Sequence, residues 1–369
     1  MSEFEAIRPY NDKEVSGVVA RLVADSDLLH AVGLFISPRL SRSFPWLARW
    51  LVARVLKRNT RDLTDVAAVQ AMFANYFGRM IETTVSDFTC SGLDDLEANK
   101  PYLFIANHRD ITLDSGFLNY ALLQHGFATT QIAIGDNLIS ESFASDLFRL
   151  NKSFVIERSA KGVKAIFRAL SRSSRYIRHS LEEGESVWIA QREGRAKNGI
   201  DITEPALIKM LGLAYRKDVE HFADYLKVVN LVPVAVSYEL DPCDQMKARE
   251  LATIARDGSY NKPDGEDLRS IVKGITGFKG RVHLNFGKPV SGAHEKPEEV
   301  AIAVDAAISA GVKIFPTHIE AAKLLDKPSA VACDSQPLAK VTEAFEDHLS
   351  SCSDEERPFL LAQYANQIR

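Results

Sequence analysis

An apolar run followed at once by histidine and aspartate is the first feature of this sequence that could do chemistry. The run YLFIA at 102–106 has the composition of a buried strand, and His108, Asp110 and Asp114 come after it. A histidine can accept a proton near neutral pH, and a nearby carboxylate can fix its tautomer and stabilise the imidazolium that forms. Either aspartate could be that carboxylate. Taken alone, such a stretch is more often structural, with Asp114 capping a helix and His108 in a loop with its hydrogen bonds satisfied.

Two further apolar runs end in arginine. The run SFVIERS at 153–159 ends in Arg158 and Ser159, and a third run begins at 186 with SVWIAQREGRAKNG. The polar residues that follow this third run are Glu193, Gly194, Arg195 and Lys197. Arginine binds phosphate through a planar fork of donors, and glycine lets the backbone approach a bound anion closely. If the three strands are neighbours, a base and an anion clamp face one pocket, which suits deprotonation of a hydroxyl on a phosphorylated substrate.

These strand ends need a sheet to bring them together, and the chain beyond residue 100 predicts one. Short β-rich runs alternate there with helical stretches. The strand candidates are 102–106, 130–134, 153–157, 186–190, 229–237 and 281–286. The helix candidates are 115–125, 161–182, 204–225, 244–257, 264–276 and 297–310. The alternation predicts an α/β fold with a mixed, mostly parallel sheet flanked by helices, whose strand ends at the carboxyl side form the ligand site.

Helices are predicted on both sides of this α/β region. Residues 12–90 are interpreted as helical, and the segment 64–81 begins at Thr64, a residue type that caps helices. We expect an N-terminal helical region at 1–90, an α/β domain at 91–316 and a C-terminal helical extension at 317–369.

The segment 44–58, FPWLARWLVARVLKR, is an amphipathic helix by its spacing. One face carries Phe44, Ala48, Leu51, Val52, Val55 and Leu56, and the opposite face carries Arg49, Arg54, Lys57 and Arg58. Trp46 and Trp50 lie near the border. The pattern favours a helix packed on the domain with its charges in water, and a basic helix lying in a membrane interface is the alternative.

Composition limits the classes of function. The 369 residues carry 45 basic and 49 acidic side chains, so the net charge of −4 gives no general attraction to nucleic acid. The four cysteines are far apart and form no C-x-x-C pair, which predicts neither a disulfide framework nor a zinc site. A polar start without a signal peptide, and no long uncharged apolar stretch, predict a cytoplasmic protein without a transmembrane helix.

The same strand ends resemble, in order, the sequence blocks of the glycerolipid acyltransferase superfamily, which includes glycerol-3-phosphate and lysophosphatidate acyltransferases. The resemblance covers about residues 85–320. NHRDITLD is similar to the family's His-x4-Asp block, and NKSFVIERS to the block with a phosphate-binding arginine, here Arg158. IAQREGRAKNG resembles the Glu-Gly-x-Arg/Ser block through Glu193, Gly194 and Arg195, and NLVPVAVSYE resembles the fourth block, with Pro233 as its proline.

The sequence departs from the family pattern at two positions. The family carboxylate lies five residues after the histidine, and this position is Leu113 here, with Asp114 one residue further. We expect a one-residue insertion in the loop with Asp114 as the carboxylate, and keep Asp110 as the alternative. Arg192 stands where many members of the family have proline.

The resemblance implies an O-acyltransferase of phospholipid biosynthesis. His108 would take the proton of an acceptor hydroxyl, which attacks the thioester of acyl-CoA or acyl-carrier protein without a metal or another cofactor. Arg158, Arg195 and Lys197, with Glu193 and Gly194, would bind an acceptor such as glycerol-3-phosphate or a lysophospholipid. Peripheral contact with the inner membrane face stays the alternative for residues 44–58, and binding of nucleic acid is not expected.

Three other functions compete with this interpretation. The string HRD invites a protein kinase, but Ser115 stands where kinases have asparagine, and there is no D-F-G or glycine-rich phosphate loop. A thioester or ester hydrolase would commonly carry a G-x-S-x-G elbow, which the sequence lacks. A non-catalytic lipid-binding or membrane-surface protein would not need His108 with its carboxylate.

Overall fold

The computed structural model describes residues 3–139, 142–219, 221–222, 224–291, 294–327, 331, 333 and 335–368. Contacts divide the chain into two units, each built from two separate segments. Unit 1 comprises Met1–Tyr76 and Gln131–Tyr176, and unit 2 comprises Phe77–Thr130 and Ile177–Arg369. The expected boundaries near residues 90 and 316 stay a prediction, because these units are defined by contacts between distant segments.

Unit 1 combines the N-terminal helices with a pair of strands from the middle of the chain. Its helices are α1 (Asp12–Ala24), α2 (Ser26–Ile36), α3 (Pro38–Ser43), α4 (Pro45–Asn59), α7 (Ser142–Leu150) and the first parts of α5 (Val66–Thr84) and α8 (Val163–Glu182). Strands β3 (Gln131–Gly135) and β4 (Ser153–Ile156) pair in parallel, and the short 3-10 helix η2 (Asp136–Ile139) follows β3. Apolar residues of α1, α5 and α7 form its core: Val15, Val18, Leu22, Val69 and Leu150.

Unit 2 holds the strand that precedes His108. Its strands are β1 (Asp87–Ser91), β2 (Leu103–Ala106), β5 (Val187–Ala190), β6 (Leu231–Tyr238) and β7 (Arg281–Phe286). They lie in the order β1-β7-β6-β2-β5, and all neighbours are parallel except β6 and β7. Strands β2 and β6 are buried along their whole length, as expected for strands covered on both faces.

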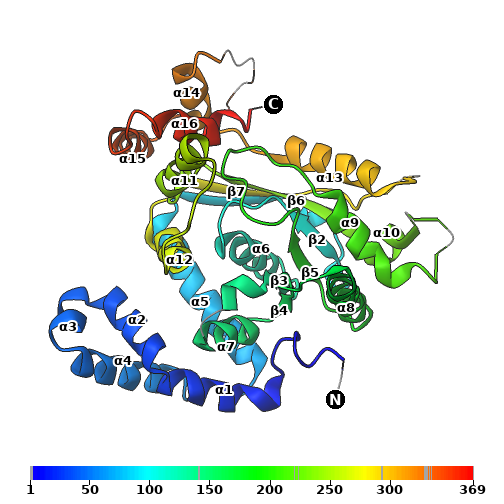
Figure 1. Ribbon diagram of the computed structural model, residues 1–369, viewed down its shortest axis with the longest axis horizontal. Coiled ribbons are helices and arrows are strands. Elements are labelled where there is room, and N and C mark those ends of the chain that lie inside the picture. Colours follow the sequence, from blue (N-terminus) through cyan, green and yellow to red (C-terminus); the bar gives the residue numbers. More distant parts are fainter. Residues whose placement is uncertain are drawn as a thin grey trace. The chain divides into compact units, whose positions relative to one another are not determined.

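Helices cover both faces of this sheet (Figure 1). The helix α13 (Pro297–Gly311) packs on one face, where Gly311 approaches Ala235 and Asn285 so closely that a Cβ would collide with the Asn285 side chain. The helix α6 (Leu113–Gln124) packs on the other face, where the Phe117 ring contacts Tyr238 of β6. Side chains alternate along a strand, so Ala235 and Tyr238 point to opposite faces.

The remaining helices of unit 2 follow the strands along the chain. They are α9 (Pro205–Gly212), α10 (Asp224–Val229), α11 (Asp244–Asp257), α12 (Glu266–Thr276), α14 (Pro316–Leu324), α15 (Ala339–Ser350) and α16 (Arg357–Ala365), with 3-10 helices η1 (Leu93–Asp95) and η3 (Leu213–Tyr215). Helices α14, α15 and α16 pack with α11 around a separate apolar cluster that includes Ala248, Ala321, Phe345 and Leu360. The described part of the predicted C-terminal extension is therefore largely helical and shares its core with α11.

The mixed, mostly parallel sheet is confirmed, and all six predicted strands are present. Strand β1 was missed, because residues 12–90 were assigned to helices and DFTCS alternates weakly. The predicted helix 204–225 is wrong as one element, since it is divided into α9, η3 and the start of α10, and residues 220 and 223 lie outside the described residues. Asp65 rather than Thr64 caps α5, because its carboxylate accepts from the Ala68 amide at 2.8 Å.

The amphipathic segment forms α4, but only part of its apolar face is covered. Ala48 and Val52 are buried, whereas Trp46 is 65% and Trp50 56% exposed. Phe44, Leu51 and Val55 are exposed as well. The favoured interpretation of a helix packed on the domain therefore holds for only part of this face. Among the described helices, none alone is long and apolar enough to cross a membrane, although α13 and α14 together pass that test as a sharply bent pair.

Candidate active site

His108 and Asp114 are joined by a hydrogen bond in unit 2. Strand β2 ends at Ala106 and α6 begins at Leu113, so both residues flank a short loop at the carboxyl end of a buried strand. The Nδ1 atom of His108 lies 2.8 Å from Oδ2 of Asp114, whose side chain is 1% exposed. A carboxylate can only accept, so Nδ1 carries the proton and the lone pair is on Nε2. No described residue hydrogen-bonds to Nε2, which leaves it able to take a proton from a substrate.

The carboxylate of Asp114 is held by more than the histidine. Its Oδ2 atom also accepts from the main-chain amides of Arg109 at 2.6 Å and Asp110 at 3.0 Å. Its Oδ1 atom accepts from the hydroxyl of Tyr238 at 2.8 Å. Hydrogen bonds to a carboxylate favour its ionised form, so these donors offset the cost of burying it.

The helix-cap interpretation of Asp114 is wrong, and Asp110 shapes the loop instead. The Oδ1 atom of Asp110 accepts from the amides of Thr112 and Leu113, both at 3.0 Å. Its Oδ2 atom is buried and has no hydrogen-bond partner among the described residues. Burial, and then the negative charge of Asp114, raise the pKa of Asp110. The described hydrogen bonds join His108 to Asp114 and not to Asp110, and the one-residue insertion stays a prediction.

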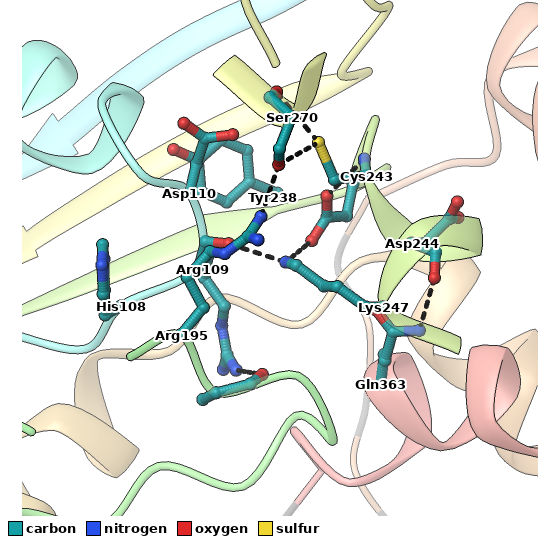
Figure 2. A network of polar contacts seen from close by, with 12 residues as sticks. His108, Arg109, Asp110, Arg195, Tyr238, Cys243, Asp244, Lys247, Ser270 and Gln363 are labelled. Atoms are coloured by element: carbon teal, nitrogen blue, oxygen red, sulfur yellow. Dashed lines mark hydrogen bonds and ion pairs between the residues drawn. The ribbon is translucent and has the colours of Figure 1, made fainter. Parts of the chain in front are cut away.

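Buried polar residues that the sequence did not indicate hold the loop between β2 and α6 in place. Asn107 accepts from the Val236 amide at 2.7 Å and donates to the Val236 carbonyl at 3.1 Å, which pins the loop to β6. The guanidinium of Arg109 forms a buried ion pair with Asp201 at 2.6 Å. Lys247 donates to the main-chain oxygen of Arg109 at 2.6 Å (Figure 2). Only the tertiary fold brings these residues together, and no local spacing in the sequence indicates it.

The block that follows β5 is tied to the same loop. The Ala196 amide donates to the main-chain oxygen of His108 at 2.8 Å, which places the block beside the histidine. Arg195 donates through Nη1 to the Ser270 hydroxyl of α12 at 2.7 Å (Figure 2). Gly194 has a φ of 72°, a conformation that favours glycine. The predicted site residues of unit 2 therefore lie in two segments joined by a main-chain hydrogen bond.

Lys197 and Glu193 differ in their surroundings. Lys197 is half-buried and forms an ion pair with Glu250 of α11. Burial lowers the pKa of Lys197, although the Glu250 carboxylate acts in the opposite direction. Glu193 is exposed at the surface of the block. The positive charge of Lys197 is thus partly balanced within the protein, whereas the Ser270 partner of Arg195 is neutral.

Arg158 belongs to unit 1 and is described there by itself. It follows β4, and its guanidinium would lie 3.1 Å from a Cβ at Gly135 of β3, so glycine makes room for it. Beside it, Asp136 accepts from the amide and the hydroxyl of Ser159 at 3.0 and 2.6 Å. Burial alone would raise the pKa of Asp136, but the hydrogen bonds from Ser159 lower it on balance. The phosphate-binding role of Arg158 stays a prediction.

An aromatic ring also packs against the imidazole. The ring of His108 lies edge-on to the ring of Trp188 in β5, with 6.0 Å between centroids. Trp188 is buried, and the His108 side chain is 15% exposed. The imidazole is therefore oriented by Asp114 and Trp188 and keeps a small exposed edge. Within the described ranges, no group of three or more His, Cys, Asp or Glu residues could hold a metal ion.

Comparisons with known proteins match one family model and several solved structures. Residues 87–236 match the family model described as Acyltransferase, and this range includes all the predicted site residues. One of the solved structures is the 1-acyl-sn-glycerophosphate (LPA) acyltransferase PlsC from Thermotoga maritima, with 16% sequence identity and a TM-score of 0.39. That match covers 77% of this chain and 95% of the other. No curated protein matches the sequence.

Proposed function

We propose that the protein transfers a fatty acyl group from a thioester to a hydroxyl of a phosphate-bearing glycerol acceptor, and the match of residues 87–236 to the Acyltransferase family model supports this proposal. Glycerol-3-phosphate and lysophospholipids such as lysophosphatidate are the proposed acceptors, and acyl-CoA or acyl-carrier protein is the proposed donor. The observation that carries the proposal is the 2.8 Å hydrogen bond between His108 and the buried Asp114 carboxylate. The reaction would be a step of phospholipid biosynthesis.

The proposed chemistry needs one base and no further cofactor. Nε2 of His108 takes the proton of the acceptor hydroxyl while its oxygen attacks the thioester carbonyl carbon. The tetrahedral intermediate then collapses, the carbon–sulfur bond breaks, and the leaving thiolate takes the proton back from the imidazolium. The products are an ester and a free thiol. Base assistance of this kind contributes roughly 10²–10⁴-fold to the rate.

Arg195 is the proposed partner of the acceptor phosphate in unit 2. Its guanidinium has five donors, and Nη1 donates to the neutral Ser270 hydroxyl, so its positive charge stays uncompensated by that contact. A charge-assisted, forked contact with phosphate is what arginine provides best. Lys197 is a weaker candidate, because its ammonium group already pairs with the Glu250 carboxylate and would have to bind the phosphate as well. The proposed role of Arg158 rests on the resemblance of its sequence block.

We further propose that α2–α4 bind the surface of an anionic membrane, which would place a cytoplasmic enzyme at the inner membrane face. Large apolar side chains are exposed along these helices: Phe35, Ile36, Phe44, Trp46, Trp50, Leu51 and Val55. Basic residues lie among them: Arg39, Arg42, Arg49, Arg54, Lys57 and Arg58. Exposed tryptophan beside basic residues is typical of helices that lie in the bilayer interface.

Vesicle sedimentation tests this membrane contact. The protein should bind vesicles that contain phosphatidylglycerol more tightly than vesicles of phosphatidylcholine alone. The Trp46→Ser/Trp50→Ser double variant should bind both more weakly, and Tyr76→Ser, which removes an exposed aromatic residue of α5 outside the proposed surface, serves as the control. Equal binding by wild type and double variant would remove α4 from the contact.

Thiol release from acyl-CoA and from acyl-carrier protein tests the proposed activity. The assay is run with glycerol-3-phosphate, dihydroxyacetone phosphate, lysophosphatidate or a lyso-aminolipid as acceptor. We expect release that depends on one or more phosphate-bearing acceptors, with an ester product identified by mass. Release without any acceptor would indicate a thioesterase instead. Binding of lipid with no release under any condition would indicate a non-catalytic lipid-binding protein.

A further inference from the structure

The two oxygens of Asp114 have different partners, and the second one has a partner that the proposed chemistry does not use. Oδ2 accepts from His108 and from two loop amides. Oδ1 accepts from the Tyr238 hydroxyl at 2.8 Å, and no other donor to Oδ1 occurs among the described residues. Since Asp114 is 1% exposed, Tyr238 supplies what water would supply at a surface carboxylate.

Tyr238 is held rigidly in place. It is the last residue of β6 and is 5% exposed, and its ring contacts Phe117 of α6 with 5.8 Å between centroids at an angle of 70°. Phe117 lies one helical turn after Asp114 on the same helix. The strand thus positions the donor, the helix positions the acceptor, and the ring contact fixes one against the other.

The Tyr238 hydroxyl is the donor in this hydrogen bond as long as Asp114 is ionised. Burial, and then the negative charge of Asp114, raise the pKa of the Tyr238 hydroxyl well above its ordinary value, so the hydroxyl keeps its proton. The other charged groups that act on it are the carboxyls of Asp110 and Asp241. A protonated phenol facing a carboxylate can only donate to it.

From this geometry, and building on the proposed function, we propose that Tyr238 is a positioning residue that acts on His108 through Asp114. The hydroxyl fixes the plane of the carboxylate, so that Oδ2 stays in line with Nδ1 of His108. It also draws negative charge toward Oδ1, which limits how strongly the carboxylate stabilises the imidazolium. Loss of the hydroxyl would free the carboxylate plane to rotate and would let the carboxylate stabilise the imidazolium more strongly.

Tyr238→Phe tests the proposal, and Tyr364→Phe is its matched control. Tyr364 is equally buried and donates at 2.6 Å to a buried carboxylate, that of Asp244, which has no contact with His108 or Asp114 among the described hydrogen bonds. For Tyr238→Phe we expect kcat to fall about 10- to 100-fold, as for other residues that orient a functional side chain, with both KM values nearly unchanged. The acid limb of the kcat/KM profile should move to higher pH by roughly half a unit.

The control should lose thermal stability to a similar extent and keep the wild-type kcat and pH profile. Identical kcat and pH profiles in the two variants would show that Tyr238 only contributes to stability. If Tyr238→Phe does not fold, Tyr238→3-fluorotyrosine keeps the shape and the hydrogen bond but makes the phenol a stronger donor. The acid limb should then move to lower pH, and an unchanged limb would overturn the proposal.

A second readout separates this proposal from the proposed function. The NMR signals of the His108 ring, assigned by their loss in His108→Gln, are titrated in wild type, Tyr238→Phe and Tyr364→Phe. We expect the midpoint to move only in Tyr238→Phe, whether or not any acceptor supports thiol release. Coincident titrations in all three proteins would refute the positioning role, and absent thiol release in wild type would refute the proposed function alone.

Discussion

Replacing Asp114 by asparagine removes one charge and leaves the shape of the site. The side-chain carbonyl of asparagine can take the place of Oδ2 and accept from His108 and the two loop amides, while the amide nitrogen can donate to the Tyr238 oxygen. The imidazole should therefore stay where it is. What is lost is the attraction between the carboxylate and the imidazolium that forms when His108 takes the acceptor proton.

The size of that loss follows from the geometry. The Nδ1–Oδ2 distance is 2.8 Å, which puts the two charge centres about 4 Å apart, and the side chains are only 15% and 1% exposed. At an effective dielectric constant of about 20, unit charges at about 4 Å attract by about 4 kcal/mol, which corresponds to about 10³-fold in rate. We expect kcat to fall by about this factor, with little change in either KM, because Asp114 faces the imidazole and not the proposed substrates.

Asp110→Asn is the matched control for this experiment. It makes the same chemical change four residues earlier, at a carboxylate that the described hydrogen bonds do not join to His108. Its kcat in the acceptor-dependent thiol-release assay should stay within about threefold of wild type, and circular dichroism should show both variants folded. A loss of activity in Asp110→Asn as large as in Asp114→Asn, or wild-type activity in Asp114→Asn, would refute the assignment of the carboxylate.

Three further outcomes can be checked. Burial and the charge of Asp114 raise the pKa of Asp110, so ionisation of Asp110 costs stability as pH rises through that raised value. Melting curves should therefore show that Asp110→Asn is more stable than wild type toward about pH 8 and equally stable below about pH 4. A difference that is constant with pH would contradict this. Asp201→Ala leaves the buried Arg109 guanidinium without its 2.6 Å ion-pair partner. The free energy of unfolding from denaturant titrations should fall by about 3–5 kcal/mol, and a loss below about 1 kcal/mol would mean that water reaches Arg109. Arg195→Ala should raise the KM of the acceptor far more than that of the thioester, and equal increases would remove Arg195 from the phosphate site.

The sequence predicted the parts of the fold and site that depend on local pattern. The apolar runs that became β2, β4, β5 and β7 are short, bounded by polar residues and fully or alternately buried, so composition located them within a residue or two. Asp114 was chosen over Asp110 from the order of the sequence block, and the hydrogen bond to His108 agrees with that choice.

What the sequence did not predict depends on contacts between distant segments. Strand β1 exists because it pairs with β7, almost 200 residues later, and its own composition is weak. Tyr238 lies just beyond the predicted strand 229–237, and Asp201 lies between predicted elements. Only the fold places the first at Asp114 and the second at Arg109. The exposure of Trp46 and Trp50 could not be read from helical spacing, because spacing defines a face but not what covers it.

The most direct test of His108 as the general base is the acceptor-dependent rate of thiol release in His108→Ala. The chemistry at Nε2 should be lost while α6 and its hydrogen bonds to the loop remain, so the melting temperature should stay close to that of wild type. We expect the rate to fall by at least about 10²-fold with every acceptor that wild type uses. A folded His108→Ala protein that releases thiol at the wild-type rate would contradict the proposed mechanism.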